Sequence, residues 1–168
     1  MRHDSTGDGR CRWTASAVVA LTLVLLFLAP GRAADDPAPA LLAEVNRVRA
    51  AHGLKALGGD TRLAAAASGH ARAMADGVFL DHRAPDGTGL AERASAAGYR
   101  FRFLAENIAA GHAAPASVVQ GWMNSDGHRR NLLQADAVEA GVGYAFRPRE
   151  RGSAGFRHYW VLVLAAPR

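Results

Sequence analysis

Hydrophobic residues recur at helical spacing in two stretches of the first half of the chain. The first stretch begins at Ala40 and is followed by the natural C-terminal cap Gly53, which predicts a helix with an apolar face. The second covers residues 61–77, follows the good N-cap Asp60 and finishes at Gly77. The two predicted faces comprise Leu41, Leu42, Val45 and Val48, and then Leu63, Ala67, His70 and Met74.

The middle of the chain alternates turn formers with short regular segments. Residues 78–89 contain Pro-Asp-Gly and are predicted to form a loop. Residues 90–97 are predicted to form a short helix, closed by Gly98. Aromatic residues then alternate with arginines, which predicts an extended segment that ends before Glu106. We interpret the residues around Glu106 as a polar loop.

The last third of the chain changes from helical to extended patterns. Pro115 is placed to open a helix, and a helical turn is predicted over residues 127–133. Residues 137–148 and 156–166 are rich in Val, Tyr, Phe and Trp, which predicts two strands of a hairpin with a long loop. Helices that come first and strands that come late predict an α+β fold, with helices covering a small antiparallel sheet.

The first thirty residues have the pattern of an export signal. Arginines precede an apolar run over residues 15–29, and small residues precede a cut between Ala33 and Ala34. The run is shorter than the ~20 apolar residues that a spanning helix needs, and an uncleaved anchor is the alternative. We therefore expect a secreted or periplasmic protein with no membrane span in its mature domain. The predicted boundaries are a signal peptide over 1–33, a linker over 34–39 and one domain over 40–168.

Charge and cysteine content narrow the function classes. The formal net charge is +5, but the basic residues are scattered among acidic ones, so we expect no nucleic-acid partner. Cys11 is the one cysteine, and it lies in the predicted leader. The exported domain then has no thiol nucleophile, no disulfide and no cysteine zinc ligand. We expect a monomer held together by its hydrophobic core.

Histidine and glutamate supply the candidate chemistry, because nucleophile-elbow, phosphate-loop, zinc-helix and dinucleotide motifs are missing from the sequence. His82, Glu106 and His128 lie in polar, turn-like segments, where binding residues tend to sit. They can bind zinc or another divalent metal, with His82 and His128 as ligands, or form an acid/base pair. Their separations of 24 and 22 positions obey no local spacing rule, so both interpretations stay open. His70 is interpreted as a buried core histidine.

Five segments, in order, resemble the CAP superfamily of cysteine-rich secretory, antigen 5 and pathogenesis-related proteins, in its bacterial cysteine-free form. They are LLAEVNRVRAAHGLKAL, LAAAASGHARAMADGVFLDH, ENIAAG, WMNSDGHRRNLL with GVGYAF, and HYWVLVLA. The resemblance runs from Ala40 to the last residue. It implies a three-layer α-β-α sandwich with a small, mainly antiparallel sheet.

The resemblance also implies a central cleft. His82, Glu106 and His128 match three of the four cleft residues of the family, and we expect Asn107 and Ser125 to line the cleft beside them. Many eukaryotic members have a second glutamate three residues after the tryptophan of the WMNSDGH segment, where this chain has Ser125. The full two-histidine, two-glutamate arrangement is therefore absent, which weakens an assignment as a hydrolase.

These features predict an exported binding or interaction module whose cleft takes up a divalent cation or a small ligand. Its partner would be an extracytoplasmic protein, a lipid or a cell-wall ligand. One alternative is a hydrolase of peptide or cell-wall material, in which a histidine and Glu106 activate water, with or without a metal. The other is lipid or sterol binding, which occurs in some members of the family.

Overall fold

The computed structural model describes residues 36–148 and 154–168, which form five helices and four strands. The predicted leader, with Cys11, and the first two residues of the predicted linker lie outside the described residues. In chain order the elements are α1 (Ala38–Ala51), β1 (Gly58–Gly59), α2 (Thr61–Gly77), α3 (Leu90–Ala96), β2 (Phe101–Ala110), α4 (Pro115–Met123), α5 (Asp126–Leu132), β3 (Glu139–Phe146) and β4 (His158–Pro167). Within these ranges no helix has the length and apolar content needed to cross a bilayer.

The four strands form one sheet in the order β1-β3-β4-β2. β4 pairs antiparallel with both β3 and β2, which confirms the predicted hairpin and the mainly antiparallel sheet. The exception is β1, which runs parallel to β3 over two residues. A pair of glycines carries no strand signal, so this short strand could not be predicted from the sequence.

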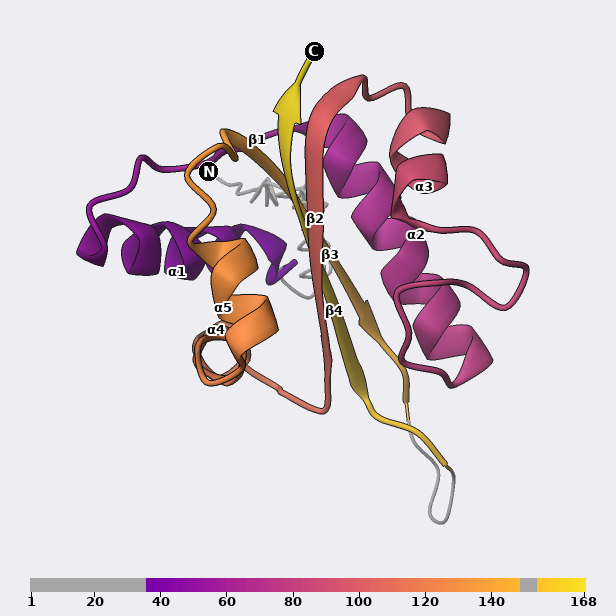
Figure 1. The fold of residues 1–168 in the computed structure, drawn as a ribbon. Coiled ribbons are helices and arrows are strands. Elements are labelled where there is room, and N and C mark those ends of the chain that lie inside the picture. Colours follow the sequence, from indigo (N-terminus) through magenta and orange to yellow (C-terminus); the bar gives the residue numbers. More distant parts are fainter. Residues whose placement is uncertain (1–35, 149–153) are drawn as a thin grey trace, which may run out of the picture. The chain divides into compact units, whose positions relative to one another are not determined.

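Helices cover both faces of the sheet, so the structure has the predicted three layers. Figure 1 shows the sheet edge-on, with α1, α4 and α5 on one side and α2 and α3 on the other. Alternate residues of β4 serve the two layers: Trp160, Leu162 and Leu164 pack in the core on the α1 side, and Val161 and Val163 pack in the core on the α2 side. Burial on both faces explains why this strand reads as a continuous hydrophobic run.

One helix packs unusually close to the sheet. A Cβ atom on Gly141 would lie 2.1 Å from the carbonyl carbon of Leu63, and one on Gly143 would lie 2.2 Å from that of Ala67. Glycine in these two positions of β3 therefore lets the backbone of α2 approach the strand directly. The contact fixes the height of α2 above the sheet, and with it the start of the loop that follows α2.

Arg49 in α1 is a buried cation that holds two loops. It is 1% exposed, and its guanidinium donates to the carbonyl oxygens of Lys55, Leu132, Gln134 and Ala137, at 3.0, 2.8, 2.9 and 3.3 Å. These carbonyls come from the segment after α1, from the last residue of α5 and from the segment between α5 and β3. Arg49 therefore ties the first helix to the last one.

Two predicted boundaries are corrected by the structure. The extended segment does not end before Glu106, because β2 continues to Ala110 in register with β4. The polar residues Glu106 and Asn107 looked like a loop, but both are buried in the middle of this strand. In addition, α1 begins at Ala38, so the last two residues of the predicted linker are helical.

Candidate functional site

Glu106 is the central group of the candidate site. The backbone of Glu106, in β2, pairs with that of Val163 in β4, and the Glu106 side chain is 3% exposed. One carboxylate oxygen, Oε1, lies 2.8 Å from Nδ1 of His82, and the other, Oε2, lies 2.7 Å from a terminal nitrogen of Arg93. A buried carboxylate needs such partners, because burying an unpaired charge is costly. Both oxygens of Glu106 are therefore already engaged.

Arg93 reaches Glu106 from α3 and also holds the loop that carries His82. Its second terminal nitrogen donates to the carbonyl oxygens of His82 and Thr88, at 3.1 Å each. The start of α3 is fixed in turn, since Glu92 accepts the backbone N–H of Gly89 at 3.0 Å. One guanidinium thus joins β2, α3 and the loop before it.

His82 is held by Glu106 through a single ring nitrogen. The carboxylate of Glu106 is an acceptor, so Nδ1 of His82 carries the proton and donates it in this hydrogen bond. The other ring nitrogen, Nε2, is left to bond another molecule. The pKa of His82 is raised, first by this hydrogen bond, against an opposing effect of partial burial. The His82 side chain is 56% exposed, so Nε2 lies on an accessible group. A ligand can be hydrogen-bonded here, and a proton can be taken up or released.

His128 lies on the other side of β2. Glu106 and Asn107 are neighbours on a strand and point to opposite faces, and Asn107 donates to the backbone carbonyl of His128 at 3.0 Å. Asn131 donates to the Asn107 side chain at 2.9 Å and to the carbonyl of Glu106 at 3.1 Å. Nδ1 of His128 pairs with the Ser125 hydroxyl at 3.0 Å. These bonds join α5 and its N-cap to β2.

The structure brings His82 and Glu106 into one pocket, and it places His128 near enough for the charge of His82 to act on its ring. The pocket has a volume of about 250 Å³, and its lining comprises His82, Arg83, Gly89, Leu90 and Glu106. The pKa of His128 is lowered mainly by burial and further by the charge of His82. The two histidines are therefore close enough to interact electrostatically across the edge of β2. Asn107 and Ser125 hold His128 and do not line this pocket.

The side chains around the two histidines bear on the expected divalent-metal site. Among residues 36–148 and 154–168 there is no group of three His, Cys, Asp or Glu side chains arranged to hold a metal. Protein zinc sites use at least three such ligands. Glu106 is committed to His82 and Arg93, and the position of the family's second glutamate holds Ser125. A second carboxylate, that of Asp81, lies near His82 and accepts the backbone N–H of Arg83 at 2.8 Å.

Sequence reasoning missed Arg93 and Asn131. Asn131 lies in the same GHRRN segment as His128, so its side-chain amide was a visible candidate for a partner of Asn107. Arg93 gave no signal of its own, because an arginine in a short helix usually points to solvent. Here it is nearly buried, with 11% of its side chain exposed.

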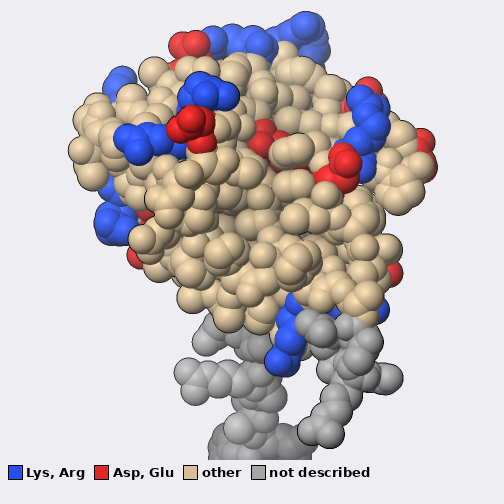
Figure 2. All heavy atoms as spheres, turned by 60° about the horizontal axis from the view of Figure 1, so that its bottom comes forward, with Lys and Arg blue, Asp and Glu red and all other residues tan. Residues whose placement is uncertain are grey.

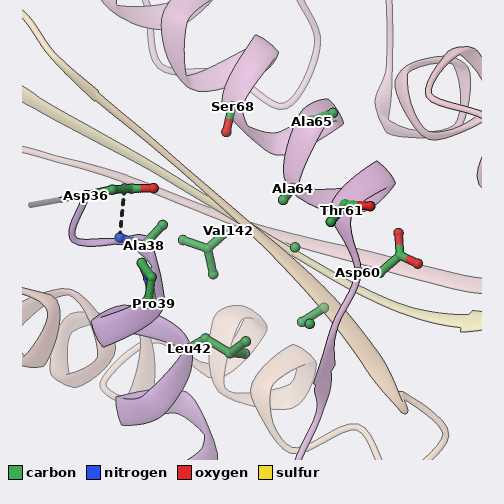
Figure 3. A pocket seen from close by; sticks show the side chains of 13 residues that line it. Asp36, Ala38, Pro39, Leu42, Asp60, Thr61, Ala64, Ala65, Ser68 and Val142 are labelled. Atoms are coloured by element: carbon green, nitrogen blue, oxygen red, sulfur yellow. Dashed lines mark hydrogen bonds between the residues drawn. The ribbon is translucent and has the colours of Figure 1, made fainter.

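A larger pocket, of about 520 Å³, lies at the opposite edge of the sheet. Figure 3 shows it between the start of α1 and the first half of α2, lined by small apolar side chains such as Ala64, Leu42 and Val142. Its ionised groups are Asp36, which accepts the backbone N–H of Ala38 at 3.0 Å, and Asp60, which caps α2 and pairs with Arg62 at 2.6 Å. The pocket therefore offers apolar surface but no free reactive group.

Charges of both signs are mixed on the surface. Figure 2 shows basic and acidic side chains next to one another on the face that it displays.

Comparison with known sequences points to one family. A family model described as the cysteine-rich secretory protein family (CAP) matches residues 42–164. The uncharacterized protein YkwD of Bacillus subtilis is 36% identical over 99 residues, which are 59% of this chain and 38% of YkwD. The chain thus spans well under half the length of this curated relative.

Solved structures show the same fold. An extracellular protein containing a SCP domain from Bacillus anthracis is 29% identical, with a TM-score of 0.67 over 77% of this chain and 40% of that chain. An outer surface protein of Borrelia burgdorferi is 21% identical, with a TM-score of 0.69 over 77% of this chain and 92% of that chain.

Proposed function

The chain belongs to the cysteine-rich secretory protein (CAP) family, and we propose that its domain is an exported binding module for a small polar ligand or peptide group. The ligand would be held at the pocket that His82 and Glu106 share. One observation carries this proposal: the buried Glu106 is fully paired with His82 and Arg93, which presents the other nitrogen of an oriented imidazole to solvent. Such an imidazole is preorganised to bind a hydrogen-bonding group, and preorganisation lowers the entropic cost of binding.

The size of the pocket favours a ligand that is only partly enclosed. Its volume of about 250 Å³ is below the range of about 300–1,000 Å³ that encloses drug-sized molecules. A peptide terminus, a peptide side chain or one sugar of a cell-wall fragment can enter, while the rest of the molecule stays outside. A binding partner with an extended shape therefore suits the site better than a compact cofactor does.

An address outside the cytoplasm supports the same proposal. The first residues have the pattern of an export signal, and the matched Bacillus anthracis protein is described as extracellular. Peptide and cell-wall material are both present there.

Binding is tested by following the backbone resonances of the purified protein while short peptides and cell-wall glycopeptide fragments are added. We expect shifts at Gly89, Leu90 and Glu106, which line the pocket. The shifts should disappear in His82→Gln and persist in His52→Gln, a control whose ring bonds the Val48 carbonyl at the end of α1. If a ligand shifts these resonances equally in His82→Gln and in His52→Gln, His82 does not bind it.

A hydrolase is the second candidate, and the His82–Glu106 pair favours it. A carboxylate that orients an imidazole and raises its pKa is the arrangement of a general base and its partner. Glu106 itself is not available as the base, because both its oxygens are engaged. Hydrolysis of peptide or cell-wall substrates should then fall about 100-fold or more in Glu106→Gln. Turnover that survives this change would rule out the mechanism.

Lipid or sterol binding has one structural support, the apolar pocket between α1 and α2. A lipid chain would lie against Leu42, Ala64 and Val142, away from His82. Sedimentation of the protein with liposomes tests this use of the pocket, and Ala64→Asp should reduce it. Equal sedimentation of this variant and the unchanged protein would place lipid contacts elsewhere.

A further inference from the structure

His70 occupies a buried position directly beneath the loop that carries His82. It lies on the inner face of α2 and is 1% exposed. Its Nε2 is 2.8 Å from the backbone carbonyl oxygen of Asp81, the residue before His82. A carbonyl oxygen only accepts, so Nε2 must carry the proton. The structure therefore fixes the tautomer of a histidine that the sequence marked as part of the core.

The remaining ring nitrogen of His70 has no partner among the described residues. Nδ1 is buried without a hydrogen bond, and an unsatisfied buried polar atom costs about 1–3 kcal/mol. Leucine or methionine would fill the same apolar face without that cost. Burial also lowers the pKa of His70, so the ring stays neutral and Nε2 stays a donor. A core packing role alone does not account for an imidazole in this position.

The backbone between His70 and His82 is strained and needs an anchor. Val78 follows α2 in the left-handed conformation, at φ 54° and ψ 47°, which β-branched residues strongly disfavour. Such strain persists only where the surrounding structure enforces it, and it clusters at functional sites. The Phe79 ring lies 6.0 Å from the His70 ring, edge to face, and covers Gly77, where a Cβ would be 2.9 Å away. His70 thus contacts the turn at Phe79 and at Asp81.

We propose that His70 is a positioning residue for His82: its Nε2–H, bonded to the Asp81 carbonyl, holds the strained turn so that the His82 ring meets Glu106. The loop is then fixed from two sides, by His70 at Asp81 and by Arg93 at the carbonyl of His82. This inference rests on the proposed use of His82 as the ligand-binding group. It adds a residue that touches neither the ligand nor Glu106.

Two substitutions with side chains of similar length distinguish the effect of the hydrogen bond to Asp81 from the effect of filling the space. His70→Gln keeps a side-chain N–H that can reach the Asp81 carbonyl, and His70→Met fills the same space without a donor. The readouts are the Nδ1 proton resonance of His82, which reports its bond to Glu106, and the amide exchange rates of residues 79–83. Neither readout needs a ligand, so a failure of the proposed function and a failure of this inference are distinguishable.

We expect His70→Met to lose the Nδ1 proton resonance of His82 and to exchange the amides of residues 79–83 about tenfold faster, as the loss of one hydrogen bond implies. His70→Gln should retain both properties. The inference is overturned if His70→Met behaves like the unchanged protein, or if both variants lose the resonance equally. The ring nitrogen shifts of His70 in the unchanged protein give an independent check that needs no variant: an Nδ1–H tautomer would also overturn it.

Discussion

At Glu106, one buried carboxylate satisfies two cationic partners of different character. Arg93 is always charged and nearly buried, whereas His82 is exposed and its pKa is raised by its hydrogen bond to Glu106. Arg93 therefore supplies the permanent countercharge, and the His82 contact can change with pH without leaving the carboxylate unpaired. Glu106 can therefore orient the exposed ring of His82 while Nε2 of that ring stays accessible to a ligand.

The pH dependence of stability follows from the raised pKa of His82. Its folded-state pKa lies above the unfolded value of about 6.5, so the pair contributes stability that is fully present below about pH 6.5. That contribution is lost as the pH rises through the raised pKa. We expect the unfolding free energies of the unchanged protein and His82→Gln to differ most in mild acid and to converge on raising the pH. Urea unfolding from about pH 5 to about pH 9 measures this; a gap that widens with pH has the wrong sign.

Removing the charge of Glu106 should destabilise the fold. Glu106→Gln leaves the guanidinium of Arg93 buried beside a neutral group, and breaking a buried ion pair in this way costs about 3–5 kcal/mol. The control is Glu44→Gln, which breaks an exposed pair with Arg47 and should cost less than about 1 kcal/mol. Chemical unfolding of both variants gives the comparison. Equal losses would mean that Glu106 is not a structural ion-pair partner.

Among the elements, the close contact between α2 and β3 depends on two glycines. Gly143→Ala would place a Cβ 2.2 Å from the backbone of Ala67, and backbone cannot move aside as a flexible side chain can. Overpacking of this kind costs about 1–3 kcal/mol or more. Gly69→Ala, in α2 with nothing within 4 Å of its Cβ, should instead stabilise by about 1 kcal/mol. Melting temperatures that shift in the same direction would contradict this account of the interface.

Helices were predictable from sequence because their signals are local. The periodic faces that begin at Leu41 and Leu63 and the proline at residue 115 gave α1, α2 and α4 close to their observed bounds. β2 was cut short because Glu106 and Asn107 are charged and polar, which normally marks a loop. Their burial became possible only through partners that come from distant parts of the chain, and no local pattern contains those partners.

The hydrogen bonds that connect the candidate site residues could not be predicted from the sequence. Segment resemblance singled out His82, Glu106 and His128, which lie 24 and 22 positions apart. The pairing of His82 with Glu106 requires α3, since Arg93 fixes both. The contact between Asn107 and the backbone of His128 depends on the alternation of side chains along β2. These contacts join segments that are far apart in the sequence, so only the folded structure shows them.

For the whole molecule, Arg49 is the link between the first helix and the segment that leads into β3. Arg49→Met would leave four carbonyl oxygens without their donor, and each buried unsatisfied group costs about 1–3 kcal/mol. We expect a loss of at least about 3 kcal/mol. Arg47→Met, on the exposed face of the same helix, should lose under about 1 kcal/mol. Denaturant midpoints measure both; a mild effect at Arg49 would show that water replaces its bonds.

In the described residues, the sheet and its helices support the accessible imidazole of His82. Both faces of the sheet are covered by helices, and the edge at β2 carries the paired Glu106 on one side and Asn107 on the other. Solved structures of different length share this fold: the chain covers 40% of the Bacillus anthracis protein and 92% of the Borrelia burgdorferi protein.

The central claim is that Glu106 holds His82 through Nδ1 and leaves Nε2 free for a ligand. The most direct test is a pH titration of the His82 ring nitrogens by ¹⁵N nuclear magnetic resonance in the unligated protein. We predict the Nδ1–H tautomer in the neutral form and a pKa above the ordinary value of about 6.5. An Nε2–H tautomer, or a pKa at or below that value, would contradict the pairing and with it the proposed binding site.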